Sequence, residues 1–327
     1  MSVFKTILLV ALPASGKSEL RNFLAQMESG RLREEFHIGE NLQLDDFPYV
    51  HMMRQIDLAL AKKDYPAQYY ASCEKPFLED YDWGTLIQLL NEDYRNLKNR
   101  VRIKPASHAM YLFERIDRAS VAVGLKPRMA LLPEDIRVFC AQELEAEAAK
   151  LRADFEAQYT DDFTDRTIII ECARGGTDGS PMPLKGAFGY QYTLPQFGPE
   201  ILDEAVVLYL WVTPEESRRK NNERANPDDP GSNLFHGVPM EVMLHDYGCD
   251  DMTYLREHAE QPDTLTVKAH GGIWHLPVGV VDNRVDKTTF LRADKAQWDP
   301  AKVEEITAAV RGATDTLWEK YTGRTSC

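Results

Sequence analysis

Gly16, Lys17 and Ser18 place a flexible backbone position, an ammonium group and a hydroxyl group in direct succession near the start of the chain. The apolar run 6–11 before them is typical of a buried strand, and apolar residues recur at helical spacing over 19–27. The sequence therefore predicts a strand, a tight loop and a helix in that order. Because the first N–H groups of a helix point together and favour an anion, this stretch predicts a phosphate-binding site.

Carboxylates follow two further predicted strands. Asp45 and Asp46 follow the strand expected at 40–44, and Glu171 ends the β-branched run 167–171. The carboxyl ends of parallel strands share one edge of an open α/β sheet, where ligands bind. Because side chains alternate along a strand, only one of the two aspartates is expected to point into this cleft. An Asp-Asp turn that caps the next helix is the alternative.

Residues 11–18, ALPASGKS, resemble the Walker A loop GxxxxGK[ST] of P-loop NTPases, with Ala11 at the place of the first glycine. In that family the lysine bridges the β- and γ-phosphates of the nucleotide and the hydroxyl binds Mg²⁺. The resemblance implies ATP and Mg²⁺ as cofactors, with Ser18 as a metal ligand. An ordinary glycine-containing turn with a solvated Lys17 is the alternative. The residues implied to contact the nucleotide here are Pro13, Ala14, Ser15, Gly16, Lys17, Ser18 and Glu19.

The resemblance extends to small-molecule kinases of this superfamily, such as nucleoside and nucleotide kinases and zeta-toxin-like kinases. It implies that Asp45 or Asp46 takes the proton from the attacking hydroxyl group. Glu171 resembles a Walker B acid, which supports Mg²⁺, and Arg174 would lie near the transferred phosphate. An ion pair between Glu171 and Arg174 that closes a glycine-rich turn is the alternative.

The predicted strand 205–211 leads into Thr213-Pro214 and a basic helix. This series resembles the lid of P-loop kinases, at about 212–240. The resemblance implies that Arg218, Arg219 and Arg224 stabilise charge on the phosphates. A solvated basic helix is the alternative, in which Arg219 pairs with Glu223.

Asn283 follows the last predicted core strand, in a loop that contacts the nucleotide base in kinases of this superfamily. The run 283–286, Asn-Arg-Val-Asp, is also similar to the guanine-reading N-K-x-D of GTPases. The acid-x-x-Gly switch of GTPases is missing after strand 167–171, so the resemblance favours ATP. The loop 179–199 is rich in glycine, proline and aromatic residues, and Tyr190 and Phe197 are among the rings expected to stack on a ligand.

Composition limits the classes of function. The 327 residues are 43% hydrophobic, and the formal net charge is −14. This acidic balance argues against a nucleic-acid partner, and no apolar stretch is long enough for a transmembrane helix. The five cysteines are scattered without a CxxC pair, so we expect neither a zinc site nor a disulfide framework, and a cytoplasmic location.

These patterns predict an α/β fold, with a P-loop kinase-like parallel sheet, flanking helices and a helical insertion. Residues 1–48 and 165–327 would form the core with its lid, and 49–164 an insertion that binds the acceptor. The function expected from the resemblance is transfer of the γ-phosphoryl group of ATP to a nucleoside, nucleotide, sugar or similar small acceptor. A nucleotide-binding switch or slow NTPase is the alternative. The oligomeric state stays open.

Overall fold

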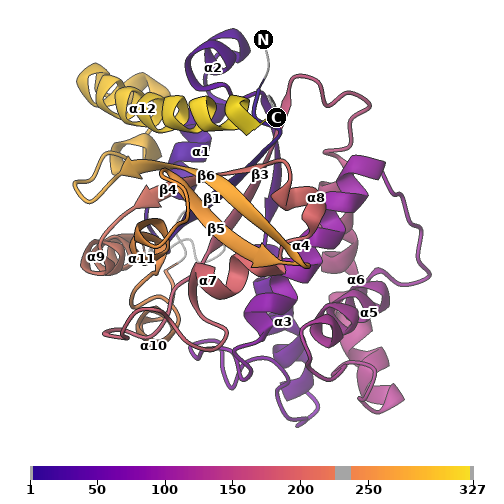
Figure 1. Cartoon of the computed structure of the whole chain (residues 1–327). Coiled ribbons are helices and arrows are strands. Elements are labelled where there is room, and N and C mark those ends of the chain that lie inside the picture. Colours follow the sequence, from indigo (N-terminus) through magenta and orange to yellow (C-terminus); the bar gives the residue numbers. More distant parts are fainter. Residues whose placement is uncertain (1–2, 225–236, 325–327) are drawn as a thin grey trace.

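The computed structural model describes residues 3–224 and 237–324 and contains one six-stranded sheet. The strand order is β2-β3-β1-β4-β6-β5, and all neighbours are parallel except β5 and β6 (Figure 1). The expected α/β architecture with a mostly parallel sheet is therefore confirmed. The strands are β1 (Thr6–Ala11), β2 (Glu40–Asp45), β3 (Arg166–Ala173), β4 (Ala205–Trp211), β5 (Thr264–Ala269) and β6 (Gly272–Asp282).

The chain leaves β1 in one direction along the sheet and leaves β3 in the other. From β1 it runs to β2 at the sheet edge, and from β3 it passes beyond β1 to reach β4. Connections that diverge in this way open a crevice at the carboxyl ends of the strands. The crevice therefore lies beside the loops that follow β1, β2 and β3.

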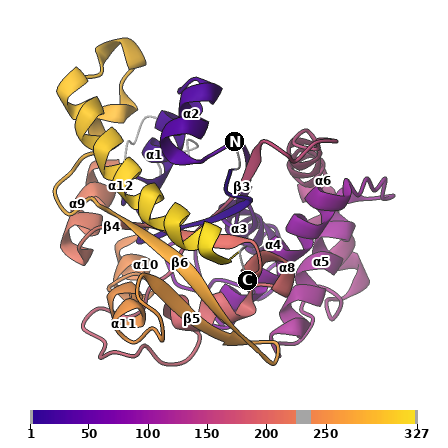
Figure 2. The same cartoon turned by 45° about the horizontal axis from the view of Figure 1, so that its top comes forward.

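Alternating side chains of the strands bury the two faces of the sheet separately. Ile7 and Leu9 of β1 pack against α1 (Lys17–Ala25), α2 (Ser29–Phe36) and α12 (Pro300–Arg324). Leu8 and Val10 point to the other face, towards α4 (Asp82–Asn99), α7 (Gly189–Thr193) and α8 (Pro199–Leu202). In Figure 2, α12 crosses the sheet on the same side as α1. The period-two burial of β1 thus gives a three-layer core.

The interval between β2 and β3 is helical, and it contributes a hydrophobic cluster of its own. Its helices are α3 (Phe47–Ala61), α4, α5 (His108–Ala122) and α6 (Glu134–Glu156). α4 is shared, because Leu86 and Leu89 face this cluster whereas Ile87 and Leu90 face the sheet. Because α4 packs in both clusters, it holds the insertion against the sheet. Helices α5 and α6 lie at the right of both views (Figures 1 and 2).

The segment after β3 corrects one expectation. Tyr190 and Phe197 are fully buried against the sheet, so these rings are core residues rather than stacking surfaces for a ligand. The remaining helices are α9 (Pro214–Arg224), α10 (Met240–His245), α11 (Met252–Glu257), η1 (Leu194–Gln196), η2 (Thr289–Arg292) and η3 (Lys295–Gln297). Within residues 3–224 and 237–324, no helix is both long and apolar enough to cross a membrane.

Candidate functional site

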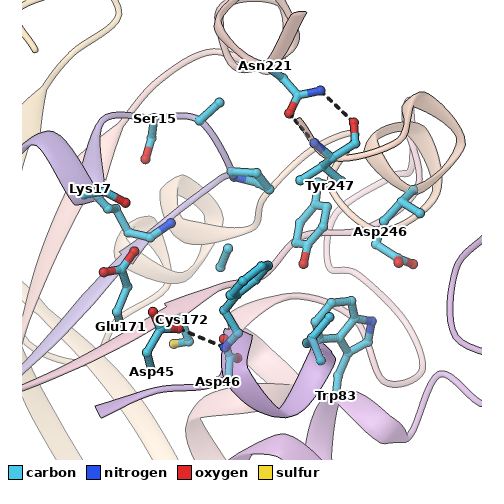
Figure 3. A pocket seen from close by; sticks show the side chains of 18 of the residues that line it. Ser15, Lys17, Asp45, Asp46, Trp83, Glu171, Cys172, Asn221, Asp246 and Tyr247 are labelled. Atoms are coloured by element: carbon cyan, nitrogen blue, oxygen red, sulfur yellow. Dashed lines mark hydrogen bonds between the residues drawn. The ribbon is translucent and has the colours of Figure 1, made fainter. Parts of the chain in front are cut away.

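A hollow opens at the carboxyl ends of β1, β2 and β3, where the topology places the crevice. Its empty volume is about 1130 Å³ when the open mouth and the solvent in it are included. Figure 3 shows Lys17, Glu171 and Asp45 on one side, and Trp83, Asp246 and Tyr247 on the other. Six further lining residues that matter below are Ser15, Ser18, Arg21, Asp46, Arg54 and Tyr70.

The loop between β1 and α1 presents open hydrogen-bond donors to this hollow. Gly16 is the N-cap of α1 with φ 105°, and Ala14 also has a positive φ of 53°. Left-handed residues in such a loop turn successive N–H groups towards one point. Within the described residues, the N–H groups of Ser15, Gly16 and Ser18 donate to no acceptor, and the buried Ser15 hydroxyl has no partner. The strand, loop and helix predicted here are confirmed, and Ala11 is unstrained because it still belongs to β1.

Gly16 also makes room for the turn that follows β6. A Cβ atom at Gly16 would lie 2.2 Å from the Thr288 hydroxyl oxygen. Asn283 donates from its side-chain amide to the Ser15 carbonyl oxygen at 2.7 Å and to the Thr288 hydroxyl at 3.0 Å, and accepts from the Lys287 N–H. The buried amide of Asn283 therefore holds the β1–α1 loop in place. The resemblance implied that Asn283 contacts a nucleotide base, but its side chain bonds to groups of the protein instead.

Lys17 lies under the loop and lines the hollow. Its Nζ is 3.4 Å from the Leu12 carbonyl oxygen, and only 7% of the residue is exposed. The neighbouring Glu19 points away, because its buried carboxylate accepts from Arg292 Nε at 2.8 Å. Lys17 thus lines the hollow beside the β1–α1 loop, whereas the Glu19 side chain pairs with Arg292 of η2.

Asp45 and Glu171 form an adjacent pair of carboxylates, since their strands pair in register. Arg21 Nη1 lies 3.0 Å from Glu171 Oε2 and 3.9 Å from Asp45 Oδ2. Asp45 Oδ1 also accepts from the Phe47 N–H at 2.9 Å. Burial, reinforced by the charges of Glu171 and Asp46, raises the pKa of Asp45 to about 7. A carboxylate with this proton affinity is suited to act as a general base near neutral pH.

Asp46 also lines the hollow, but its carboxylate pairs with the buried Arg174. The strand ends at Asp45, and Asp46 has helical φ and ψ of −84° and −15° as the N-cap of α3. The alternation of side chains therefore stops between the two. No side-chain bond from Asp46 caps α3.

Arg174 holds Asp46 instead of lying free beside a phosphate. Its Nη1 is 2.6 Å from Asp46 Oδ2, its guanidinium lies over the Trp83 ring at 4.8 Å, and 2% of the residue is exposed. Arg174 does not line the hollow. The alternative of a Glu171–Arg174 pair is also wrong, because each partner pairs elsewhere. The sequence gives no sign that Arg174 pairs with Asp46, which follows β2, and not with Glu171, which is only three residues away.

Helix α9 is fixed to the β1–α1 loop rather than raised above it. The Ser217 hydroxyl donates to the Pro13 carbonyl oxygen at 2.7 Å, and the fully buried Lys220 pairs with Asp286 at 2.7 Å. The arginines expected to face phosphates lie on other sides of the helix. Arg218 pairs with Asp178 at 2.9 Å, and Arg219, which is exposed, pairs with Glu216 and Glu223.

Arg218 and Arg219 were expected to stabilise charge on the phosphates, but both pair with carboxylates of the protein. The alternative, in which Arg219 pairs with Glu223, agrees with the structure. The physical reason is that α9 buries its small and amide side chains, Ser217 and Asn221, against the site. The side chain of Arg224 and residues 225–236 of the expected lid lie outside the described part of the chain.

The donor set fits Mg²⁺ brought in with a nucleotide. Ser18 and Glu171 both line the hollow, and Mg²⁺ is usually held by one or two protein oxygens together with substrate phosphates. Within the described residues, no group of three or more His, Cys, Asp or Glu side chains is placed to hold a metal ion. Because Arg21 pairs with Glu171, this carboxylate would be shared between Arg21 and a bound cation.

Sequence reasoning missed the site roles of Arg21, Trp83 and Tyr247. The four-residue spacing between Lys17 and Arg21 on one helix could have placed Arg21 beside the site. The sequence placed Trp83 in an apolar stripe, and it does belong to the hydrophobic cluster of the insertion, but it also lines the hollow. No local signal marks Tyr247, which reaches the hollow from the loop after α10.

Comparisons with known proteins give no family for this chain. No protein-family model matches it, and neither the curated proteins nor the solved structures contain a match. The functional argument therefore rests on the residues of the hollow.

Proposed function

We propose that this chain is a P-loop kinase-like phosphotransferase that binds ATP and Mg²⁺ and transfers the γ-phosphoryl group to a small acceptor. One observation carries the proposal. The donor-rich β1–α1 loop with Lys17 and the carboxylate of Asp45 line the same hollow. Oriented N–H groups and an ammonium suit a triphosphate, and a nearby base suits a hydroxyl acceptor.

The chain's own groups divide the work of the transfer. The loop N–H groups and Lys17 bind the β- and γ-phosphates of ATP. Ser18 and Glu171 would hold Mg²⁺, which neutralises phosphate charge when bound. Asp45 accepts the proton of the acceptor hydroxyl as its oxygen bonds to phosphorus and the bond to the ADP oxygen breaks. Since such transfers depend mainly on positioning and charge, no covalent intermediate on the protein is required.

Nucleotide binding is tested by thermal unfolding with ATP and Mg²⁺. A ligand at about 100 times its dissociation constant stabilises a folded protein by about 2.7 kcal/mol, which raises the melting temperature measurably. Lys17→Ala should lose this shift. Lys62→Ala is the matched control, because Lys62 is exposed directly after α3, pairs with Glu143 and does not line the hollow. Equal stabilisation of the Lys17→Ala variant and the parent would remove Lys17 from the site.

Transfer is tested by acceptor-dependent ADP release from a panel of nucleosides, nucleotides, sugars and small alcohols. Asp45→Asn should keep the ATP-induced shift and lose about 10²-fold or more in turnover, a typical contribution of a general base. Turnover of the parent should rise with pH up to about 7, because Asp45 must be ionised to accept a proton. ADP release that is equal with and without every acceptor would support the slow NTPase instead.

A further inference from the structure

Arg54 of α3 contributes a cation to the hollow. It lines the side of the hollow that faces the insertion, and its Nε is buried. Within the described residues, its guanidinium makes no hydrogen bond or ion pair, and it lies over the Tyr70 ring at 5.0 Å. A buried donor without a partner destabilises the folded protein. An arrangement of this kind is stabilised when an anion binds.

Two other carboxylates that line the hollow, Asp246 and Asp46, already have partners of their own. Asp246 accepts from His245 Nδ1 at 2.6 Å, and Asp46 pairs with the buried Arg174. Neither lies within ion-pair distance of Arg54. Arg54 therefore keeps its capacity for the two parallel hydrogen bonds that a guanidinium forms with a carboxylate or phosphate.

Aromatic rings form the wall beside Arg54. Trp83 and Tyr247 meet edge to face at 5.5 Å, and both line the hollow. Behind them, Phe77 contacts Trp83 at 5.0 Å and stacks on Tyr70 at 4.4 Å. Four packed rings from three segments of the chain hold this wall in one geometry. Such a wall is suited to bind a planar ring, because ring–ring contacts stabilise beyond simple burial.

We infer that the insertion side of the hollow binds an acceptor that carries both an aromatic or heterocyclic ring and a negatively charged group, with Arg54 as the partner of the charge and Trp83 and Tyr247 as the partners of the ring. The role of this ligand as acceptor rests on the proposed phosphotransferase function. The binding itself does not. In Figure 3, Trp83 and Tyr247 lie across the hollow from Lys17, so the ring and a triphosphate occupy different parts of it.

Calorimetric titration of the whole chain with three probes tests this inference. Phenyl phosphate carries the ring and the anion, benzyl alcohol carries only the ring, and inorganic phosphate carries only the anion. We expect phenyl phosphate to bind at least tenfold more tightly than either of the others. Comparable affinity for phenyl phosphate and inorganic phosphate would overturn the inference, and so would the absence of phenyl phosphate binding.

Variants then separate this site from the nucleotide site. Arg54→Met should weaken phenyl phosphate at least tenfold and leave ATP binding within twofold, and Tyr247→Leu should weaken phenyl phosphate in the same way. Arg118→Met is the matched control, because Arg118 lies exposed on α5 beside Glu92. Lys17→Ala should weaken ATP binding and leave phenyl phosphate binding within twofold. The inference would be overturned if Lys17→Ala weakened phenyl phosphate binding and Arg54→Met did not. If the parent bound phenyl phosphate but not ATP, only the proposed function would be refuted.

Discussion

Tyr190 should be critical for the stability of the sheet edge that carries the site. Its fully buried hydroxyl accepts from the N–H groups of Ala11 at 2.8 Å and Arg174 at 3.2 Å. It also donates to the carbonyl oxygen of Ala11 or Cys172, at 3.1 and 3.2 Å. One side chain of α7 thus ties together the ends of β1 and β3. Tyr190→Phe keeps the ring and removes all of these bonds.

The expected loss follows from the number of groups left without a partner. Each buried donor that loses its acceptor costs about 1–3 kcal/mol, so the two N–H groups together predict a loss of about 2–6 kcal/mol in the free energy of unfolding. Urea unfolding followed by tryptophan fluorescence gives this quantity by linear extrapolation. The variant should unfold at a clearly lower urea concentration than the parent.

Tyr192→Phe is the matched control, because it makes the same chemical change two residues along the same helix. Within the described residues, the Tyr192 hydroxyl makes no hydrogen bond, and the side chain is partly exposed. We expect this control to change the unfolding free energy by less than about 0.5 kcal/mol. Equal losses in the two variants would refute the assignment of Tyr190 as the tie between β1 and β3.

Two further predictions concern backbone geometry and pH. Gly16→Ala should destabilise the protein more than Gly124→Ala, since both glycines have positive φ but only the Cβ at Gly16 meets a neighbour, Thr288; equal melting temperatures would contradict this. Burial raises the pKa of Asp250 to about 7, although Tyr209 donates to it, so the folded state binds this proton more tightly than the unfolded chain does. The resulting stability is present below about pH 4 and lost as pH rises towards 7. Asp250→Asn should therefore be more stable than the parent by about 4 kcal/mol at pH 8 and not at pH 4, and a constant difference across thermal melts would refute it.

Strong local patterns were sufficient for the elements that carry the site. The continuous apolar runs at 6–11 and 205–211 are strands with the same bounds in the structure, and the helix after Gly16 starts one residue beyond it. A buried parallel strand needs an apolar run, and a helix needs its own period, so both can be recognised without tertiary information. Helix α2 was missed because half of the residues in Ser29–Phe36 are charged, and only Leu32 and Phe36 are buried.

Partner choice among the charged residues was the part that sequence reasoning got wrong. Arg174 was expected to contact a phosphate or Glu171, but it contacts Asp46, which is more than a hundred residues earlier in the chain. The arginines of α9 were expected to face the site, but Ser217 and Asn221 do so instead. Ion pairs between distant segments depend on register and on helix rotation, neither of which leaves a local signal.

The sequence by itself determined that a donor-rich loop connects the first strand to the first helix, and that carboxylates lie at the ends of two other strands. Both could be predicted because hydrophobic periodicity and turn chemistry act over a few residues. The tertiary structure alone decided which charges meet. Strand order brought β2 next to β3, so that Arg21 lies between Asp45 and Glu171. The docking of the insertion then set Arg54 and a wall of rings opposite Lys17, since contacts between distant segments follow from packing rather than from spacing.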